Sequence, residues 1–216
     1  MQNYSPPMIP FLEILYADEA MIIANKQSGL LSVPGRGEDK KDCLLSRVQT
    51  KFPTALTVHR LDMQTSGLII FALNKKNHAA LSRLFESRMI TKRYCAWVDG
   101  SPKEDNGSID FPILLDWPNR PLQKIDYETG KPSHTQWQVI KREKEKTYLS
   151  LSPLTGRSHQ LRIHLKEIGH PILGDPLYGT IKTRDMAPRL QLHAEFLSFI
   201  HPGSGEPFTI TSPPPF

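Results

Sequence analysis

A chain of 216 residues is long enough to bury the core of one large domain or two small ones. Lys and Arg outnumber Asp and Glu by 27 to 22, and this moderately basic balance permits a polyanionic partner without requiring one. The two cysteines, Cys43 and Cys95, are far apart and form no CxxC pair, which excludes a disulfide framework and argues against a zinc or redox dithiol site.

The N-terminal segment lacks a basic stretch followed by an apolar one, so it does not read as a signal peptide. No apolar run approaches the roughly 18 residues that a membrane-spanning helix needs. The sequence therefore predicts a protein without membrane segments that works in the cytoplasm.

Short elements punctuated by Pro and Gly follow one another along the whole chain. In the first half, the patterns predict two strands within residues 14–26 joined at 17–19, a loop over 28–41, a strand, a turn at 64–67 and a strand over 58–73, and a helix over 74–89. In the second half, they predict a strand over 93–100, loops or hairpin ends over 111–121 and 126–134, a hairpin of strands 135–140 and 147–153, a helix over 158–169 ending at Gly169, a loop over 170–179, and strands over 190–202 and 207–213.

The predicted strands outnumber the helices and arrive in hairpin-like pairs. This order favours the α+β class, with a mixed, mostly antiparallel sheet flanked by a few helices, over a doubly wound parallel fold. The predicted helix over 74–89 spaces its core side chains for one face, namely Ala80, Leu81, Leu84, Phe85 and Arg88. No composition shift marks a domain boundary, so a single domain over residues 1–216 is expected.

Several common chemistries have no motif here. The only Gly-Lys pair, Gly130-Lys131, is followed by Pro132 where a P-loop has Ser or Thr. No GxGxxG and no GxSxG occur, which argues against dinucleotide binding and weakens a hydrolase reading. His159 and His164 stand about 140° apart round a helix, so they do not share a face and no metal site is expected.

Three stretches concentrate charge beside apolar segments: HRLDMQTSG from residue 59, SRMITKRYCAWV from residue 87 and LTGRSHQLRIH from residue 154. Each has an ordinary structural reading, in which Asp62 caps a turn, Tyr94 is a strand aromatic and the arginines are solvated. Together they allow another, because a carboxylate near a core stays ionised only beside a cation, and Arg162 is one candidate. An ionised, positioned aspartate can act as a nucleophile.

At these residues the sequence resembles the RluA family of pseudouridine synthases. HRLDMQTSGL resembles its motif HRLDxxTSGL, KRYCAWVDG resembles a second motif and TGRSHQLRIH a third, followed by GHPILGDPLYG and LQLHAEFLSFIHP. The matches run in order from about residue 12 to residue 202. Within the family, DWPNRPLQKIDYETGKP and MAPRLQLHA resemble the dual-specificity member. Because the matches start early in the chain, no N-terminal S4 domain is expected.

The resemblance implies the pseudouridine synthase fold with a central active-site cleft, and it implies roles for individual residues. Asp62 would be the nucleophile, Arg162 its cationic partner, and Tyr94 the ring that holds the uracil and acts as base. Arg60 would enter the RNA stack and Leu192 would line the uracil pocket. The remaining residues assigned to substrate binding are His59, Arg157 and His159.

The implied reaction breaks the bond from the sugar C1′ to N1 of uracil and forms one from C1′ to C5, so no cofactor is expected. The implied partner is RNA, in stem-loops of large-subunit ribosomal RNA and in the anticodon stem-loop of tRNA. The chain is expected to be a monomer. Two alternatives stand beside it. A non-catalytic RNA-binding protein would use the Lys and Arg residues of the charge-rich stretches without needing Asp62. A glycosidase-like enzyme would need a second acid, for which Glu195 and Asp175 are conceivable.

Overall fold

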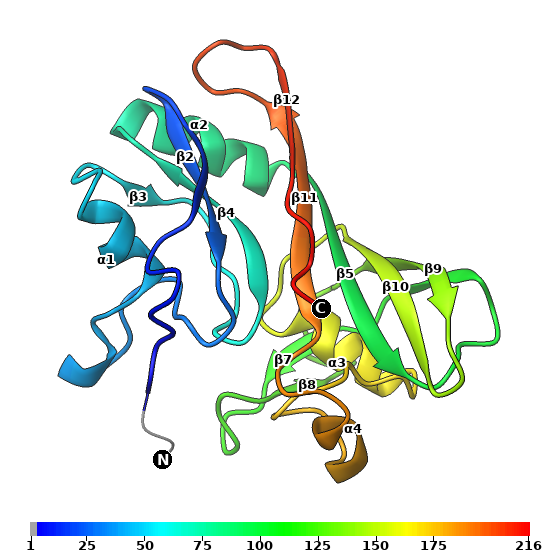
Figure 1. The fold of residues 1–216 in the computed structure, drawn as a ribbon. Coiled ribbons are helices and arrows are strands. Elements are labelled where there is room, and N and C mark those ends of the chain that lie inside the picture. The colour runs from blue at the N-terminus through cyan, green and yellow to red at the C-terminus, as the bar shows by residue number, and fades with distance from the viewer. Residues whose placement is uncertain (1–3) are drawn as a thin grey trace. The chain divides into compact units, whose positions relative to one another are not determined.

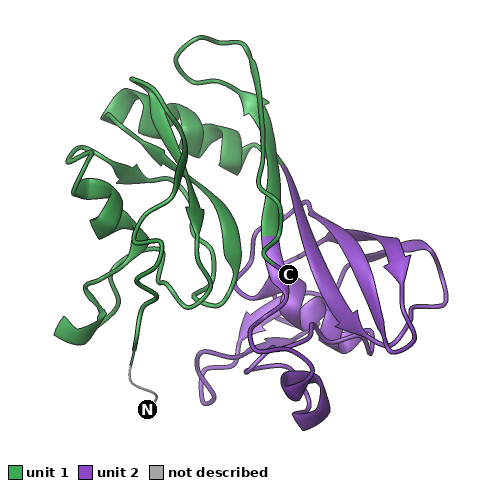
Figure 2. Ribbon diagram, in the orientation of Figure 1, with its two compact units in different colours: residues 1–91, 194–215 green, residues 92–193, 216 purple. Residues whose placement is uncertain are grey.

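In the computed structural model, which describes residues 4–216, the chain forms two compact units. Unit 1 contains residues 4–91 and 194–215, and unit 2 contains residues 92–193 and Phe216 (Figure 2). Each unit encloses its own cluster of buried apolar side chains. The single catalytic domain expected from the sequence stays a prediction.

Unit 1 is built on strands β1, β2, β4 and β11, which neighbour one another in that order, and the last three are labelled in Figure 1. Its elements are β1 (Ile14–Ala17), β2 (Met21–Lys26), the 3₁₀ helix η1 (Glu38–Lys40), α1 (Leu44–Gln49), β3 (Leu56–Thr57), β4 (Ser66–Ala72), α2 (Lys75–Glu86), most of β11 (Leu192–Ile200) and β12 (Pro207–Thr211). The short strand β3 pairs with β4, and β12 pairs with β11.

The core of unit 1 forms around β4, whose seven residues are all buried. Such an uninterrupted apolar run is typical of a strand covered on both faces. Helix α2 contributes Leu81, which has no exposed surface; its burial is worth about 2 kcal/mol. The helix begins at Asn74, whose side chain accepts a hydrogen bond from the backbone of Asn77 and satisfies one unpaired N–H of the first turn.

Three expectations for unit 1 were wrong. Residues 58–62 form no strand, and the N–H and carbonyl groups of Leu61 bond the hydroxyl group of Ser32 where a strand residue would bond its neighbour. The loop over 28–41 contains the short helix η1. Arg88 does not lie on the α2 face, because the helix ends two residues earlier and Arg88 itself has a left-handed backbone with φ of 60°.

Unit 2 contains four sheet strands that neighbour one another in the order β5-β10-β9-β6, and a separate two-stranded sheet, β7-β8. Its elements are β5 (Thr91–Asp99, starting at the last residue of unit 1), β6 (Asn106–Ile109), β7 (Ile113–Leu115), β8 (Gln123–Ile125), β9 (Thr135–Arg142), β10 (Lys146–Pro153), α3 (Gln160–Glu167) and α4 (Ile181–Asp185). The predicted hairpin across residues 141–146 is confirmed. Strand β6 and helices α1 and α4 were not foreseen.

Alternation along β10 separates the two faces of this sheet. Leu149 and Leu151 are buried and pack with Leu161 and Leu165 of α3. Ser150 and Ser152, which alternate with them along the strand, point to the opposite face. Helix α3 therefore covers one face only. It ends as predicted before Gly169, whose φ of 85° suits the left-handed residue that stops a helix.

Every strand pair with a described register is antiparallel, and strands outnumber helices among the described residues. The predicted α+β class with a mostly antiparallel sheet is therefore confirmed.

Candidate active site

Asp62 lies in a segment of irregular backbone between β3 and β4 in unit 1. The hydroxyl of Ser32 donates to the carbonyl oxygen of Leu61 at 2.7 Å and accepts from its N–H at 3.1 Å. One residue further on, the ammonium group of Lys26 donates to the carbonyl oxygen of Met63 at 2.9 Å. Both residues flanking Asp62 are thus fixed by side chains, one from the last residue of β2 and one from the loop that follows it.

Lys26 has no exposed surface, which is unusual for a lysine. Besides Met63, its ammonium group donates to the carbonyl oxygens of Gln27 and Leu30 at 2.8 and 2.6 Å. A buried ammonium group is tolerated only where acceptors surround it, and here one of them belongs to the Asp62 segment. The ion therefore stabilises the path of the backbone past Asp62.

The residues before Asp62 alternate in exposure. Leu61 is buried and Arg60 is exposed, so the guanidinium group of Arg60 extends into solvent. His59 instead accepts a hydrogen bond from the N–H of Ile70 at 3.0 Å and stacks on Phe85 with ring centroids 4.5 Å apart. His59 thus links the segment to β4 and α2, while its binding to substrate stays a prediction.

Gly67, the glycine of the same motif, is required by close packing. Its φ is +117°, and a Cβ atom there would lie 2.3 Å from the carbonyl oxygen of Ala194 on β11. Any larger residue would push β4 and β11 apart.

Arg162 lies on α3 in unit 2, and its side chain is 2% exposed. Its Nε and Nη2 atoms donate to the two carboxylate oxygens of Asp175 at 2.8 and 2.7 Å. Burial raises the pKa of the Asp175 carboxyl group, but the hydrogen bonds and charge of Arg162 outweigh burial and hold this pKa below its usual value. Asp175 is therefore an ionised partner of Arg162 and not the protonated acid that a glycosidase-like reading needs. The predicted pairing of Arg162 with Asp62 stays a prediction.

Tyr178 joins several of these residues. Its hydroxyl group bonds Nδ1 of His159 at 2.8 Å and accepts from the N–H of Gln123 on β8 at 2.8 Å. Its ring faces Arg162, with the guanidinium carbon 5.3 Å from the ring centroid. His159 itself is held at φ of 55°, directly before the first turn of α3. Arg157 donates from Nε to the carbonyl oxygen of Pro132 at 3.3 Å.

Tyr94 and Leu192 both belong to the core region of unit 2. Tyr94 is half-buried and packs against the apolar cluster, and its partner across the sheet is Leu151 on β10. Leu192 is 3% exposed and belongs to the same cluster. Their assignment to the uracil site stays a prediction.

Helix α3 is anchored to β9 by polar side chains. Gln160 donates to the hydroxyl oxygen of Thr135 at 3.0 Å, and Thr135 in turn bonds Nδ1 of the buried His164 at 3.0 Å. Nε2 of His164 bonds the carbonyl oxygen of Phe111 at 2.9 Å. Burial lowers the pKa of His164, so the imidazole is neutral at neutral pH.

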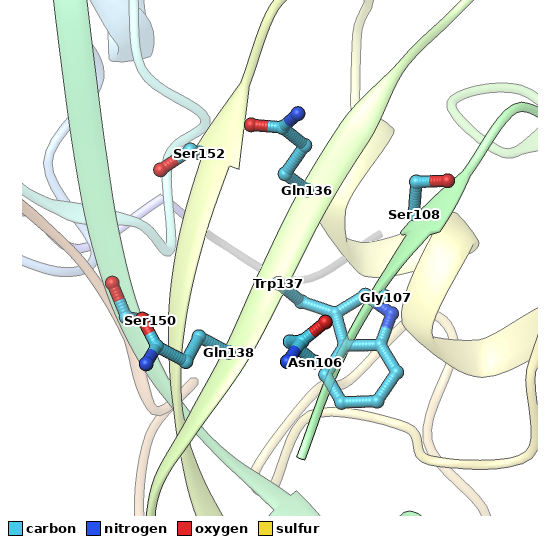
Figure 3. Close-up of a pocket in the computed structure, with 8 residues that line it drawn as sticks. All are labelled: Asn106, Gly107, Ser108, Gln136, Trp137, Gln138, Ser150 and Ser152. Carbon is cyan, nitrogen blue, oxygen red and sulfur yellow. The ribbon is translucent and has the colours of Figure 1, made fainter. Parts of the chain in front are cut away.

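Hollows lie in the described part of unit 2. One of about 580 Å³ (Figure 3) is lined by Asn106, Gly107, Ser108, Gln136, Trp137, Gln138, Ser150 and Ser152. Its lining holds no titratable side chain and so offers no general acid or base. A second, of about 430 Å³, lies between the β7-β8 pair and α3, and Tyr178 lines it.

Among residues 4–216, no three His, Cys, Asp or Glu side chains come together as metal ligands. Within the same range no helix is long and apolar enough to cross a membrane.

Sequence reasoning missed the residues that hold the motif residues in place: Lys26, Ser32, Gln160, Asp175 and Tyr178. Gln160, Asp175 and Tyr178 stand inside quoted motifs, but nothing in their spacing shows which group they bind. Lys26 and Ser32 fall in stretches read only as strand and loop. The signal that could have drawn attention to Lys26 is a lysine at the end of an otherwise buried strand.

Comparisons with known proteins agree with the motifs. A family model described as RNA pseudouridylate synthase matches residues 20–167. The dual-specificity RNA pseudouridine synthase RluA of Escherichia coli strain K12 is 50% identical over 217 residues, covering 100% of this chain and 99% of the relative. The protein of the same name from Yersinia pestis is 52% identical over 195 residues, covering 90% and 95%.

A solved structure gives the same result. Human RNA pseudouridylate synthase domain containing 1 superposes with a TM-score of 0.79 at 31% identity, covering 98% of this chain and 87% of the human one. The predicted pseudouridine synthase fold is thereby confirmed. The chain belongs to the RNA pseudouridylate synthase family, and it is an RNA pseudouridine synthase, an isomerase that converts uridine to pseudouridine in RNA.

Proposed function

We propose that this enzyme modifies uridines in two kinds of stem-loop, one in large-subunit ribosomal RNA and one in the anticodon arm of tRNA, and that Asp62 is its nucleophile. The relatives named dual-specificity enzymes are about half identical to this chain along nearly its whole length, which supports the pair of substrates. We further propose that the enzyme works as a monomer in the cytoplasm and without a cofactor.

The reaction requires no oxidation and no second substrate. The N1–C1′ bond of uridine breaks, the uracil rotates, a C5–C1′ bond forms, and the hydrogen on C5 leaves while N1 gains a proton. A carboxylate can serve by attacking C1′, by adding to C6, or by removing the C2′ proton to give a glycal. All three routes use the same ionised, positioned side chain.

The observation that carries the assignment of Asp62 is the fixing of its backbone. A segment without strand or helix pairing is held on both sides of Asp62 by buried Ser32 and buried Lys26. Fixed geometry is what a nucleophile needs, because a reacting group that is already aligned avoids much of the entropic cost of the encounter.

Base extrusion explains the neighbouring residue. The reacting atoms of uridine are hidden in a base stack, so the nucleotide must leave it, at a cost of about a few kcal/mol. Arg60 is exposed two residues before Asp62, and its guanidinium plane can fill the vacated position.

Unit 2 supplies the other groups of the proposed mechanism. Tyr94 is half-buried and packs against the apolar core of the unit, which gives its ring a fixed position. It holds the freed uracil and removes the C5 proton. Arg162 keeps the carboxylate of Asp62 ionised, and Leu192 borders the uracil.

Exposed aromatic and basic side chains support RNA binding by unit 2. Between β7 and β8, Trp117 is 65% exposed, and the guanidinium carbon of Arg120 lies 4.0 Å from the centroid of its ring. Tyr127, just after β8, is 76% exposed. Exposed rings beside cations can stack on unpaired bases and attract phosphates, which suits recognition of a loop more than of a duplex.

The test uses two stem-loop RNAs, one ribosomal and one from tRNA, that carry tritium at C5 of uridine. The wild-type enzyme should release tritium from both. Asp62→Asn should lower the release rate at least about 1,000-fold on both, because an amide cannot act as the nucleophile. Asp39→Asn, which changes an exposed aspartate of the same unit, serves as control and should release tritium like the wild type.

Release by Asp62→Asn at the wild-type rate would falsify the nucleophile assignment. Release from only one RNA by the wild type would contradict the dual substrate and leave the role of Asp62 standing.

A further inference from the structure

Asp175 is a fully buried carboxylate that contacts Arg162, and the mechanism proposed above gives it no role. It has no exposed surface, and both of its oxygens bind Arg162. We infer that Asp175 is a positioning residue, which fixes the guanidinium plane of Arg162 and acts on the reaction only through it. The inference rests on the role proposed above for Arg162.

The contact is bidentate, and this defines an orientation. Nε and Nη2 lie on one edge of the planar guanidinium group, and each donates to a different oxygen of Asp175, at 2.8 and 2.7 Å. Two parallel hydrogen bonds prevent the plane from rotating about the end of a long, flexible side chain. A single contact would leave that rotation open.

The carboxylate is itself held by the turn in which it stands. Oδ1 of Asp175 also accepts hydrogen bonds from the N–H groups of Leu177 and Tyr178 at 2.8 and 3.1 Å. The preceding Gly174 has a φ of +69°, and a Cβ atom there would lie 2.0 Å from the carbonyl oxygen of Arg189. The turn cannot shift without disturbing its neighbours, so the orientation it imposes on Arg162 is fixed.

The same turn is connected to α3 and β8. The Tyr178 hydroxyl bonds His159, directly before α3, and Gln123 at the start of β8. The Tyr178 ring lies against the guanidinium group of Arg162. Arg162 is thus confined on one edge by a carboxylate and by an aromatic ring, both from residues 175–178.

Unit 1 contains a similar ion pair that provides a control. Arg47 is 1% exposed, and its Nε and Nη2 atoms donate to the two oxygens of Asp42 at 2.7 and 2.6 Å. Its Nη1 atom donates to the carbonyl oxygens of Pro7 and Phe11, so this arginine holds the N-terminal segment in place. A purely structural role for Asp175 would make the two pairs equivalent.

The experiment is a double-mutant cycle in the full chain. Asp175→Asn is made in the wild type and in Arg162→Met, and the single-turnover rate of tritium release at saturating enzyme is measured per mole of folded protein. The affinity for the stem-loop RNA is measured separately. Asp42→Asn is the matched control.

Asp175→Asn should lower the rate about 100-fold in the wild-type background, because a misdirected catalytic contact typically costs that much. RNA affinity should stay within about threefold, and the same change in Arg162→Met should have no further effect on the rate, since coupled residues are non-additive. Asp175→Glu, which keeps the carboxylate, should recover part of the loss. Asp42→Asn should keep the wild-type rate.

An equal loss in both backgrounds, a wild-type rate for Asp175→Asn, or an equal loss for Asp42→Asn would each overturn the inference. Arg162→Met at the wild-type rate would overturn instead the proposed role of Arg162. If Asp175→Asn does not fold because Arg162 is left as an unpaired buried charge, Asp175→Glu supplies the wild-type-background rate. In Arg162→Met the unpaired buried charge is the carboxylate of Asp175, and Asp175→Asn removes it, so the second comparison is made per mole of folded protein as well.

Discussion

Three cations, Lys26, Arg47 and Arg162, are among the largest fully buried side chains of the described structure. The two arginines each bind both oxygens of one carboxylate, whereas the Lys26 ammonium group donates to three backbone carbonyl oxygens. The planar guanidinium group matches a carboxylate edge, while an ammonium group can reach acceptors in several directions. At the residue scale, charge is therefore buried where it fixes backbone or another side chain.

Replacing Lys26 tests this view. Lys26→Met keeps the length of the side chain but leaves three carbonyl oxygens without this donor, so the free energy of unfolding in urea should fall by about 3 kcal/mol. Tritium release per folded molecule should fall too, because the carbonyl oxygen of Met63 beside Asp62 loses its partner. Lys51→Met, at an exposed lysine of the same unit, should change the stability by less than about 0.5 kcal/mol. Equal unfolding midpoints for the two variants would contradict the prediction.

At the scale of a single element, helix α3 is stabilised by tertiary contacts and not by its own length. It has eight residues, too few to be stable alone, yet six consecutive ones are buried. Its apolar side chains pack on the sheet, and Gln160 and His164 both bond Thr135 of β9. Tertiary contacts therefore hold the helix, and with it Arg162, in place.

The His164 contact makes the stability of the protein depend on pH. Burial depresses the pKa of His164 in the folded state below the ordinary value of 6.5, so the unfolded chain takes up the proton first as pH falls. Stability from the neutral imidazole is fully present above pH 6.5 and is lost as pH falls below it, by up to about 1.4 kcal/mol per pH unit.

Urea denaturation at about pH 7.5 and about pH 5.5 measures this loss. His164→Gln should be less stable than the wild type at the higher pH but should lose less stability on acidification. The same decrease in both proteins would show that another group causes it.

The whole molecule carries a net charge of +5 and exposes Trp117 beside Arg120 in unit 2. A basic protein that binds RNA phosphates releases counterions, so its affinity falls as salt rises, whereas stacking of bases on rings depends little on salt. The contributions of phosphate binding and base stacking to RNA affinity can therefore be separated by removing a ring without changing the charge.

Binding of inactive Asp62→Asn to the tRNA stem-loop should weaken steeply between about 50 and 200 mM salt. Adding Trp117→Ala should lower the affinity about tenfold at every salt concentration and leave the slope unchanged, because it removes a ring and no charge. Ile140→Ala, at an exposed aliphatic residue of β9, is the control. Affinity that does not depend on salt would contradict phosphate binding.

The spacing of apolar residues and the position of Gly169 were enough to predict the strands of the hairpin β9-β10, helix α2 and the end of α3. These signals are local properties of the sequence: alternation in strands, a 3.6-residue repeat in helices, and a left-handed glycine after a helix. The ordered motifs also identified the family and singled out Asp62 and Arg162. The short elements α1, α4 and β6 carry weak local signals and were not foreseen.

Only the tertiary structure shows which groups hold the motif residues Asp62 and Arg162 in place. Residues 58–62 were predicted to belong to a strand, but Lys26 reaches Met63 across 37 positions and Ser32 reaches Leu61 across 29. Asp175, which the sequence suggested only as the second acid of a glycosidase-like enzyme, forms an ion pair with Arg162, 13 positions away. A sequence lists donors and acceptors, but which of them meet depends on the path of the chain between them, and burial then makes each such pair energetically necessary.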